Sequence, residues 1–218
     1  MFTEIDTVFF DIGSTLVDEH RADECRIREI SKKSGSDYGE CLNRIKSFFA
    51  ENKNGYHSLV KELNVELPVW HSEYEILYPD AEECLKILSA KYQIGIIANQ
   101  PKGAKERLDK FGILKYISVI AASAEEGISK PDLRLFEIAV KKAGTSPARS
   151  VMVGDRLDND IIPAKAFGMK TIWIKQGFGG CSLIRCDAEK PDYIVCNLSE
   201  VTRNSVFAKA AQKIKNKQ

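Results

Sequence analysis

Short apolar runs that end in a polar residue constrain the fold of this chain most strongly. Residues 7–12 read TVFFDI, and residues 93–98 read QIGIIA and are followed by Asn99. Runs without a polar alternate face are typical of parallel strands that helices cover on both sides. Four shorter runs have the same character, at 117–121, 151–153, 171–174 and 193–195. The sequence therefore predicts a largely parallel sheet.

Helical patterns separate these runs. Three of them end at a glycine, at Gly112, Gly144 and Gly168, where a left-handed residue commonly closes a helix. A further helix is predicted to open after Pro79 and to lead into the second strand. Regular alternation of strand and helix predicts an α/β fold with a doubly wound, Rossmann-like parallel sheet. The helices are predicted at 80–91, 102–111, 132–143, 160–167 and 198–214.

One long segment breaks this alternation. Residues 17–78 show helical periodicity at 22–33, 38–52 and 56–63, with almost no strand signal. A connection of this length is better explained by an inserted helical module than by a plain crossover. We therefore expect a smaller helical domain at 17–78 and an α/β core domain formed by 1–16 and 79–218.

Composition limits the classes of partner and the cell compartment. The 32 Lys and Arg residues nearly balance the 31 Asp and Glu residues among 218, so no basic stripe predicts a nucleic-acid partner. No apolar run approaches the roughly 18–20 residues that span a bilayer, so no membrane partner is expected. The first residues do not resemble a signal peptide, and the six cysteines lack a paired CxxC spacing. We expect a cytoplasmic protein with free thiols; its oligomeric state cannot be inferred from the sequence.

Polar side chains follow several of the predicted strands. Asp11, Asn99 and Asp155 each come at or just after the end of an apolar run, and Lys130 precedes a helix. In an open α/β sheet, ligands bind beyond the carboxyl ends of the strands. Two carboxylates held close together repel each other unless a cation lies between them, and Mg²⁺ prefers such oxygen ligands. The sequence thus predicts a magnesium site at this edge.

Four segments carry a resemblance to a known family. FFDIGSTLVDE, IGIIANQ, SKPDLRLFEIA and VMVGDRLDND resemble, in this order, the four motifs of the haloacid dehalogenase superfamily of hydrolases. The resemblance covers the whole predicted sheet domain, and the helical segment falls where this superfamily often inserts a cap. It implies a Mg²⁺-dependent hydrolase that acts on a phosphorylated small molecule.

The resemblance also implies roles for individual residues. Asp11 would attack phosphorus and form an aspartyl-phosphate, and Lys130 would balance the charge of the transferring group. Asp11, the carbonyl of Gly13, Asp155 and a second carboxylate would hold Mg²⁺. Asp160 is the expected second carboxylate, with Asp158 and Asn159 near enough to compete for this role. The substrate phosphate would meet Lys130 and the backbone N–H groups of Gly13, Ser14 and Asn99.

Two positions depart from the family pattern. Phosphatases of this family usually carry a second Asp, an acid and base, where this chain has Gly13, and a Ser or Thr where it has Ala98. A positioned acid or base is worth roughly 10²–10⁴ in rate. We therefore expect reduced activity on alkyl phosphates and better activity on aryl or acyl phosphates. Asp18, Glu19 and His20 are the residues that could replace the missing acid.

Other residues of the inserted segment could contact a substrate, although core packing or solvation is the more common reason for such residues. They are Tyr56, His57, Trp70, His71, Arg21, Arg26 and Arg28; outside the segment, Arg156 is the arginine nearest to the expected site. Two alternative functions stay open. One is a phosphonatase or dehalogenase, of which the phosphonatase would need a cap lysine. The other is a fold relative that binds ligand with little or no turnover.

Overall fold

A six-stranded parallel sheet forms the centre of the larger domain. The computed structural model describes residues 4–204 and Phe207. The strands lie in the order β5-β4-β1-β6-β7-β8, so the first strand of the chain lies between β4 and β6. Phe10 is opposite Ile96 on one side and Val153 on the other. The predicted α/β sheet is confirmed. Its strands are β1 (Thr7–Phe10), β4 (Gln93–Ala98), β5 (Val119–Ala122), β6 (Ser150–Gly154), β7 (Lys170–Ile174) and β8 (Tyr193–Val195).

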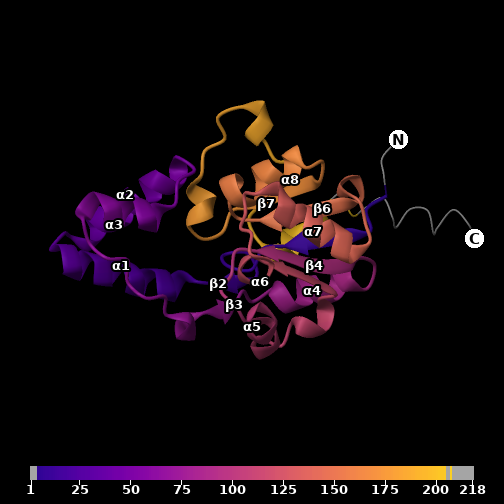
Figure 1. The fold of residues 1–218 in the computed structure, drawn as a ribbon, viewed down its shortest axis with the longest axis horizontal. Helices are drawn as coiled ribbons and strands as arrows, with labels where there is room; N and C mark the ends of the chain where they lie inside the picture. The colour runs from indigo at the N-terminus through magenta and orange to yellow at the C-terminus, as the bar shows by residue number, and fades with distance from the viewer. Residues whose placement is uncertain (1–3, 205–206, 208–218) are drawn as a thin grey trace, which may run out of the picture.

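Helices cover both faces of this sheet, which explains why its strands lack polar alternation (Figure 1). Phe10 points into a core that contains side chains of α4 (Ala81–Ser89), α5 (Ala104–Lys110) and α9 (Leu198–Arg203). Its neighbour Phe9 points into the opposite core, with α7 (Leu133–Ala143) and α8 (Ile162–Ala166). The remaining short helices are α6 (Ser123–Glu126), η2 (Leu114–Tyr116), η3 (Pro147–Arg149), η4 (Leu157–Ile161), η5 (Phe178–Cys181) and η6 (Asp187–Glu189).

Two predicted helices differ in extent from the structure. The expected helix at 160–167 begins instead as a π-helical turn, η4, and becomes α-helical only at Ile162. The expected helix at 198–214 ends at Arg203, because Asn204 takes extended backbone angles of φ −64° and ψ 141°. Beyond this point most of that predicted helix, together with the Lys-rich tail, lies outside the described residues.

The inserted segment folds into a helical cap with its own apolar core. Its helices are α1 (His20–Ser34), α2 (Tyr38–Ala50) and α3 (Gly55–Leu63), followed by the short turn η1 (Ser72–Tyr74). Ile30, Ile45 and Leu59, one from each helix, are buried together. A short antiparallel ribbon, β2 (Val17–Asp18) with β3 (Ile76–Leu77), lies at the two ends of the segment. Strands of two residues are too short to leave a sequence signal.

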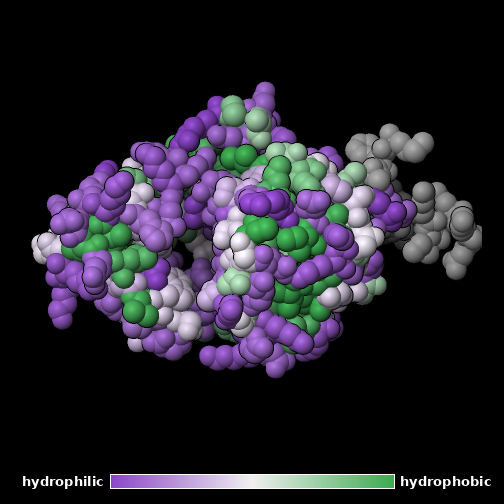
Figure 2. All heavy atoms as spheres, in the orientation of Figure 1, coloured by the Kyte–Doolittle hydropathy of each residue, from purple (hydrophilic) through white to green (hydrophobic). Residues whose placement is uncertain are grey.

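The cap lies to one side of the sheet domain, and Figure 2 shows a hollow between the two. From the sheet domain, Phe178 of η5 reaches across and stacks on Phe49 of α2 with ring centroids 5.5 Å apart. This contact joins the cap to the sheet domain at one edge of the hollow.

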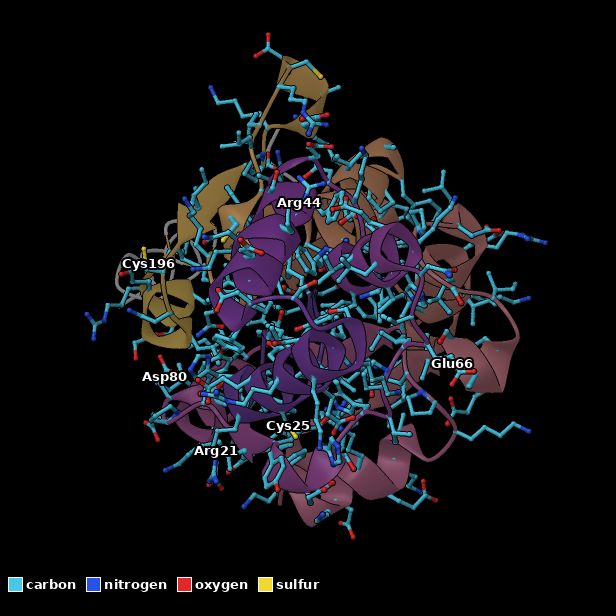
Figure 3. The ribbon with its side chains drawn as sticks, turned by 90° about the vertical axis from the view of Figure 1, so that its left-hand side faces the viewer. Arg21, Cys25, Arg44, Glu66, Asp80 and Cys196 are labelled. Atoms are coloured by element: carbon cyan, nitrogen blue, oxygen red, sulfur yellow. The ribbon has the colours of Figure 1, made fainter. Side chains whose placement is uncertain are left out.

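Surface features bear on two further expectations. No helix of the described residues combines the length and apolar character that a bilayer crossing requires. All six cysteines are free thiols. Figure 3 shows Cys25 on the cap and Cys196 at the periphery of the sheet domain, well apart from each other.

Candidate active site

Lys130 lies at the centre of a buried cluster at the carboxyl end of the sheet. Its Nζ donates hydrogen bonds to Asp11 Oδ1 at 2.6 Å, to Asp160 Oδ1 at 2.6 Å and to the carbonyl oxygen of Ile97 at 2.9 Å. These three acceptors use all three donors of the ammonium group. Burial alone would lower the pKa of Lys130, but the carboxylates of Asp11 and Asp160 outweigh it and raise this pKa. Lys130 is therefore held as a cation.

Asn99 fixes the backbone of Lys130. Its Oδ1 accepts a hydrogen bond from the Lys130 N–H at 2.7 Å, and its Nδ2 donates to the Lys130 carbonyl at 3.0 Å. Asn99 follows β4, whereas Lys130 stands before α7, so this pair of bonds joins two loops at the same sheet edge. The side chain of Asn99 thus positions Lys130, a role that the sequence analysis did not foresee.

Three aspartates converge beside Lys130. Carboxylate oxygens of Asp11, Asp155 and Asp160 all lie within 4.8 Å of one another, and all three residues are buried. Burial and the neighbouring carboxylates raise the pKa of Asp155. Burial also raises the pKa of Asp160, although Lys130 opposes this shift. Three ionised carboxylates and one ammonium leave two negative charges, which a divalent cation would neutralise.

The π-helical turn selects which acidic residue joins this cluster. Asp160 Oδ2 accepts the backbone N–H of Arg156 at 3.0 Å, which turns its carboxylate inward. Asp158 instead pairs with the Arg156 side chain at 2.6 Å. A Cβ built on Gly154 would collide with the Asp160 carboxyl, which explains the glycine before Asp155. Of the three residues left open by the sequence, Asp160 therefore lies with Asp11 and Asp155, and Asn159 lines the cavity beside them.

A further carboxylate, that of the half-buried Glu19, lies in the same cavity as Asp11. Glu19 Oε2 accepts a hydrogen bond from Ser14 Oγ at 3.2 Å, and Glu19 Oε1 lies 3.5 Å from Nη2 of Arg107. Burial and the carboxylate of Asp23 raise the pKa of Glu19 to about 8, against the opposing effect of Arg107. Among the three residues considered as a replacement acid, Glu19 lines the same cavity as Asp11.

The cluster opens into a cavity of about 640 Å³ between the sheet domain and the cap. Gly13, Ser14 and Asn99 line it on the side of the sheet, together with Arg156. From the cap, its lining includes the side chains of Asp23, Arg26, Phe49, Tyr56 and Trp70. None of the described lysines of residues 17–78 lines it, which leaves the phosphonatase alternative without its amine.

Arg26 is the cap cation that faces this cavity. Its guanidinium lies 4.5 Å from the ring centroid of Trp70 and 5.4 Å from that of Tyr56. Its Nε is buried and has no hydrogen-bond partner in the structure. Of the cap arginines considered from the sequence, Arg21 and Arg28 are instead placed over the rings of Tyr74 and Tyr38. His71 is bonded to Glu29 and Glu73.

A family model for haloacid dehalogenase-like hydrolases matches residues 5–168, which is most of the chain. The chain belongs to this family. This match of the family model confirms the resemblance drawn from the four motifs. It also confirms that the protein is a hydrolase by family.

Known relatives of this haloacid dehalogenase-like hydrolase include phosphatases. The glyceraldehyde 3-phosphate phosphatase of Pyrococcus furiosus is 29% identical over 201 residues, which cover 79% of this chain and 82% of the relative. A predicted phosphoglycolate phosphatase from Haemophilus somnus superposes with a TM-score of 0.71 at 21% identity, covering 93% and 99% of the two chains. The HAD-hydrolase YfnB of Bacillus subtilis, solved bound to magnesium, superposes with a TM-score of 0.68 at 18% identity, covering 92% and 98%. These two structural likenesses concern the fold.

Proposed function

We propose that this protein is a Mg²⁺-dependent phosphatase that hydrolyses small phosphomonoesters through an aspartyl-phosphate on Asp11. The observation that carries this proposal is the hydrogen bonding of the Lys130 ammonium to both Asp11 and Asp160 at the base of a cavity. A buried carboxylate beside a fixed cation is held in one orientation, as a nucleophile must be. The phosphatase relatives support the same reaction class.

The donor set fits a magnesium ion. Asp11, Asp155 and Asp160 offer three carboxylates within 4.8 Å of one another, and the carbonyl of Gly13 would complete the protein ligands. Hard oxygen ligands and a net negative charge favour Mg²⁺. The bound ion would neutralise charge on the phosphate and hold it in line with the nucleophile.

The chain's own residues would carry the remaining steps. Asp11 Oδ attacks phosphorus while the bond from phosphorus to the ester oxygen breaks. Lys130 faces the nucleophile and balances the negative charge that passes through the transferring group. Gly13, Ser14 and Asn99 line the cavity. Their backbone N–H groups would orient the phosphate oxygens. Water then attacks phosphorus, releases phosphate and restores the carboxylate of Asp11.

The test is a phosphatase assay on purified protein with p-nitrophenyl phosphate, with Mg²⁺ and with EDTA. We expect metal-dependent release of p-nitrophenolate that Asp11→Asn abolishes, with a loss on the order of 10⁴-fold or more. Asp158→Asn is the matched control, because Asp158 pairs with Arg156 instead of joining the cluster. Turnover that survives EDTA, or that Asp11→Asn leaves intact, would rule out this function.

A further inference from the structure

Position 13 has no side chain, although its backbone does not require glycine. Gly13 is absent from the glycines with positive φ in the described chain, so an L residue could take the same conformation. A Cβ built on Gly13 would lie 2.5 Å from Oε1 and 2.6 Å from Oε2 of Glu19. The carboxyl group of Glu19 therefore fills the space that a side chain at position 13 would enter.

The local fold brings Glu19 to this place. Glu19 directly follows β2 and precedes the first turn of α1, so the chain has turned back over the loop that follows β1. Its side chain is only 19% exposed. Ser14 and Arg107 contact its two oxygens, and Arg107 is itself fixed by Glu75 Oε2 at 2.7 Å. The carboxyl is thus held by packing and polar contacts rather than extended into solvent.

Two other carboxyl groups on the cavity wall, those of Glu75 and Asp23, are engaged elsewhere. Glu75 accepts from Trp70 Nε1 at 2.6 Å through one oxygen and from Arg107 through the other. Asp23 accepts a hydrogen bond from the hydroxyl of Tyr56. Glu19 is the one of these three that touches the Gly13–Ser14 segment, two and three residues after the nucleophile. Its position is therefore suited to a proton transfer beside Asp11.

We propose that Glu19 is the general acid and base of the reaction, and this role rests on the proposed phosphatase function. A carboxyl group can reach the space beside Gly13 either from position 13, on a short side chain, or from position 19, on a longer one. Side chains at both positions would collide. Gly13 and Glu19 then form a matched pair. With Glu19 in place, the expectation of weak activity on alkyl phosphates loses its basis.

The proton balance is complete with this one group. As Asp11 Oδ bonds to phosphorus, the ester P–O bond breaks and the Glu19 proton passes to the departing oxygen, which leaves as an alcohol. Glu19, now a carboxylate, takes a proton from the water that attacks the aspartyl-phosphate. The bond from phosphorus to Asp11 breaks, phosphate leaves, and Glu19 is protonated again.

Glu19→Gln tests this role because it keeps the size of the side chain and its hydrogen-bond acceptor but carries no transferable proton. We expect kcat/KM for an alkyl phosphate to fall about 10²–10⁴-fold. We expect kcat/KM for p-nitrophenyl phosphate to fall far less, because its leaving group needs no proton. With the aryl ester, rapid mixing should show a burst of one p-nitrophenolate per enzyme followed by slow turnover, because the base for the second step is missing. Asp18→Asn, one residue away on β2, is the matched control and should leave both esters within about threefold of the wild type.

A second variant guards against a loss caused by misfolding. Glu19→Ala should lose alkyl-ester hydrolysis, and the double variant Gly13→Asp with Glu19→Ala should regain at least about tenfold of it, since the carboxyl returns through position 13. Gly13→Asp alone should lower activity through the clash with Glu19. The role of Glu19 would be overturned if Glu19→Gln lowered kcat/KM equally for aryl and alkyl esters, or if the double variant regained no alkyl-ester hydrolysis. The phosphatase function would stand in either case. No metal-dependent turnover by the wild-type protein would overturn both.

Discussion

Buried charge occurs in two regions of this protein, and the two regions handle it differently. At the sheet edge, the ammonium of Lys130 lies between Asp11 and Asp160 and bonds to each at 2.6 Å. Glu19 and Asp23 lie close to each other on the side of the cavity formed by the inserted segment, which we call the cap-facing wall. The pKa of each is raised well above its ordinary value. At the sheet edge Lys130 opposes the burial that raises the pKa of Asp160, whereas Glu19 and Asp23 are desolvated near each other and tend to hold their protons.

This difference matches two different needs of the proposed reaction. A nucleophile and metal ligands must be ionised, and at the sheet edge the ammonium of Lys130, together with a bound Mg²⁺, would favour the ionised forms. An acid must arrive with its proton, which the cap-facing wall favours. The sheet fixes the first region through strand order, and the contacts of Glu19 with Gly13 and Ser14 help to fix the second. Single substitutions in each region would test whether the two regions differ in this way.

Lys130→Met should cause the largest loss, because it removes the cation that distinguishes the sheet edge from the cap-facing wall. We expect kcat to fall about 10²–10³-fold, the usual cost of losing one charge-stabilising donor. Breaking a buried ion pair by removing one partner also costs about 3–5 kcal/mol of folding stability. Steady-state kinetics and urea unfolding would measure both effects.

Lys142→Met provides the control for that experiment, since its ammonium pairs with Glu126 at the surface of the sheet domain. A surface ion pair contributes about 0–1 kcal/mol, so this variant should retain activity and nearly all stability. If Lys130→Met behaves like Lys142→Met, the sheet-edge cation is not needed and the contrast between the two regions fails.

Mg²⁺ should stabilise the protein more at pH 8 than at pH 5.5. Burial raises the pKa of Asp155 and Asp160 in the folded, metal-free protein. These carboxyls therefore contribute stability below their unfolded pKa, and this contribution is lost as pH rises through their folded pKa. Mg²⁺ binds the ionised forms, so it should restore stability mainly at high pH, by about 2.7 kcal/mol at 100 times Kd.

Thermal unfolding with Mg²⁺ and with EDTA at the two pH values would measure this effect. Asp160→Asn should reduce Mg²⁺ affinity at least about 10- to 100-fold, the loss that even an outer partner of a metal ligand causes. Asp158→Asn should bind Mg²⁺ as the wild type does, because its carboxylate pairs with Arg156. A metal-induced rise in Tm that is equal at both pH values would contradict the raised pKa of the cluster.

The same contrast shows what the sequence can predict. Asp11, Lys130 and Asp155 could be placed from the sequence because strand ends and the parallel order bring them to one edge. Asp160 was the expected second carboxylate, but Asp158 and Asn159 stayed open, since the choice depends on a π-helical turn that no periodicity reveals. Helix periodicity gave the cap helices their approximate bounds but not which face lines the cavity.

Glu19 and Asn99 show the same limit at the level of single side chains. Glu19 was one of three adjacent candidates, and its place in the cavity and its contacts with Gly13 and Ser14 distinguish it from Asp18 and His20. Asn99 was expected to meet the substrate through its backbone, whereas its side chain holds the main chain of Lys130. Contacts of this kind depend on tertiary geometry at the scale of an ångström, which residue types and spacing do not encode.

Asp23→Asn should have the smallest effect and should change sign with pH. Burial raises the pKa of the Asp23 carboxyl from 3.8 to about 7, although the hydrogen bond from Tyr56 lowers it. The stability that this group contributes is therefore complete below about pH 4, falls between pH 4 and 7, and is lost above pH 7. An uncharged amide removes the cost of the ionised form, while its unpaired N–H groups impose a smaller one. We expect the variant to be neutral or less stable at pH 5 and about 1–2 kcal/mol more stable at pH 8.

Urea unfolding at both pH values would measure this difference. Asp37→Asn is the control, because Asp37 is the exposed N-cap of α2 and its Oδ1 accepts the N–H of Glu40. This variant should change the stability by the same amount at both pH values. An Asp23→Asn effect that does not depend on pH would show that the cap-facing wall holds its carboxyls no differently from the protein surface.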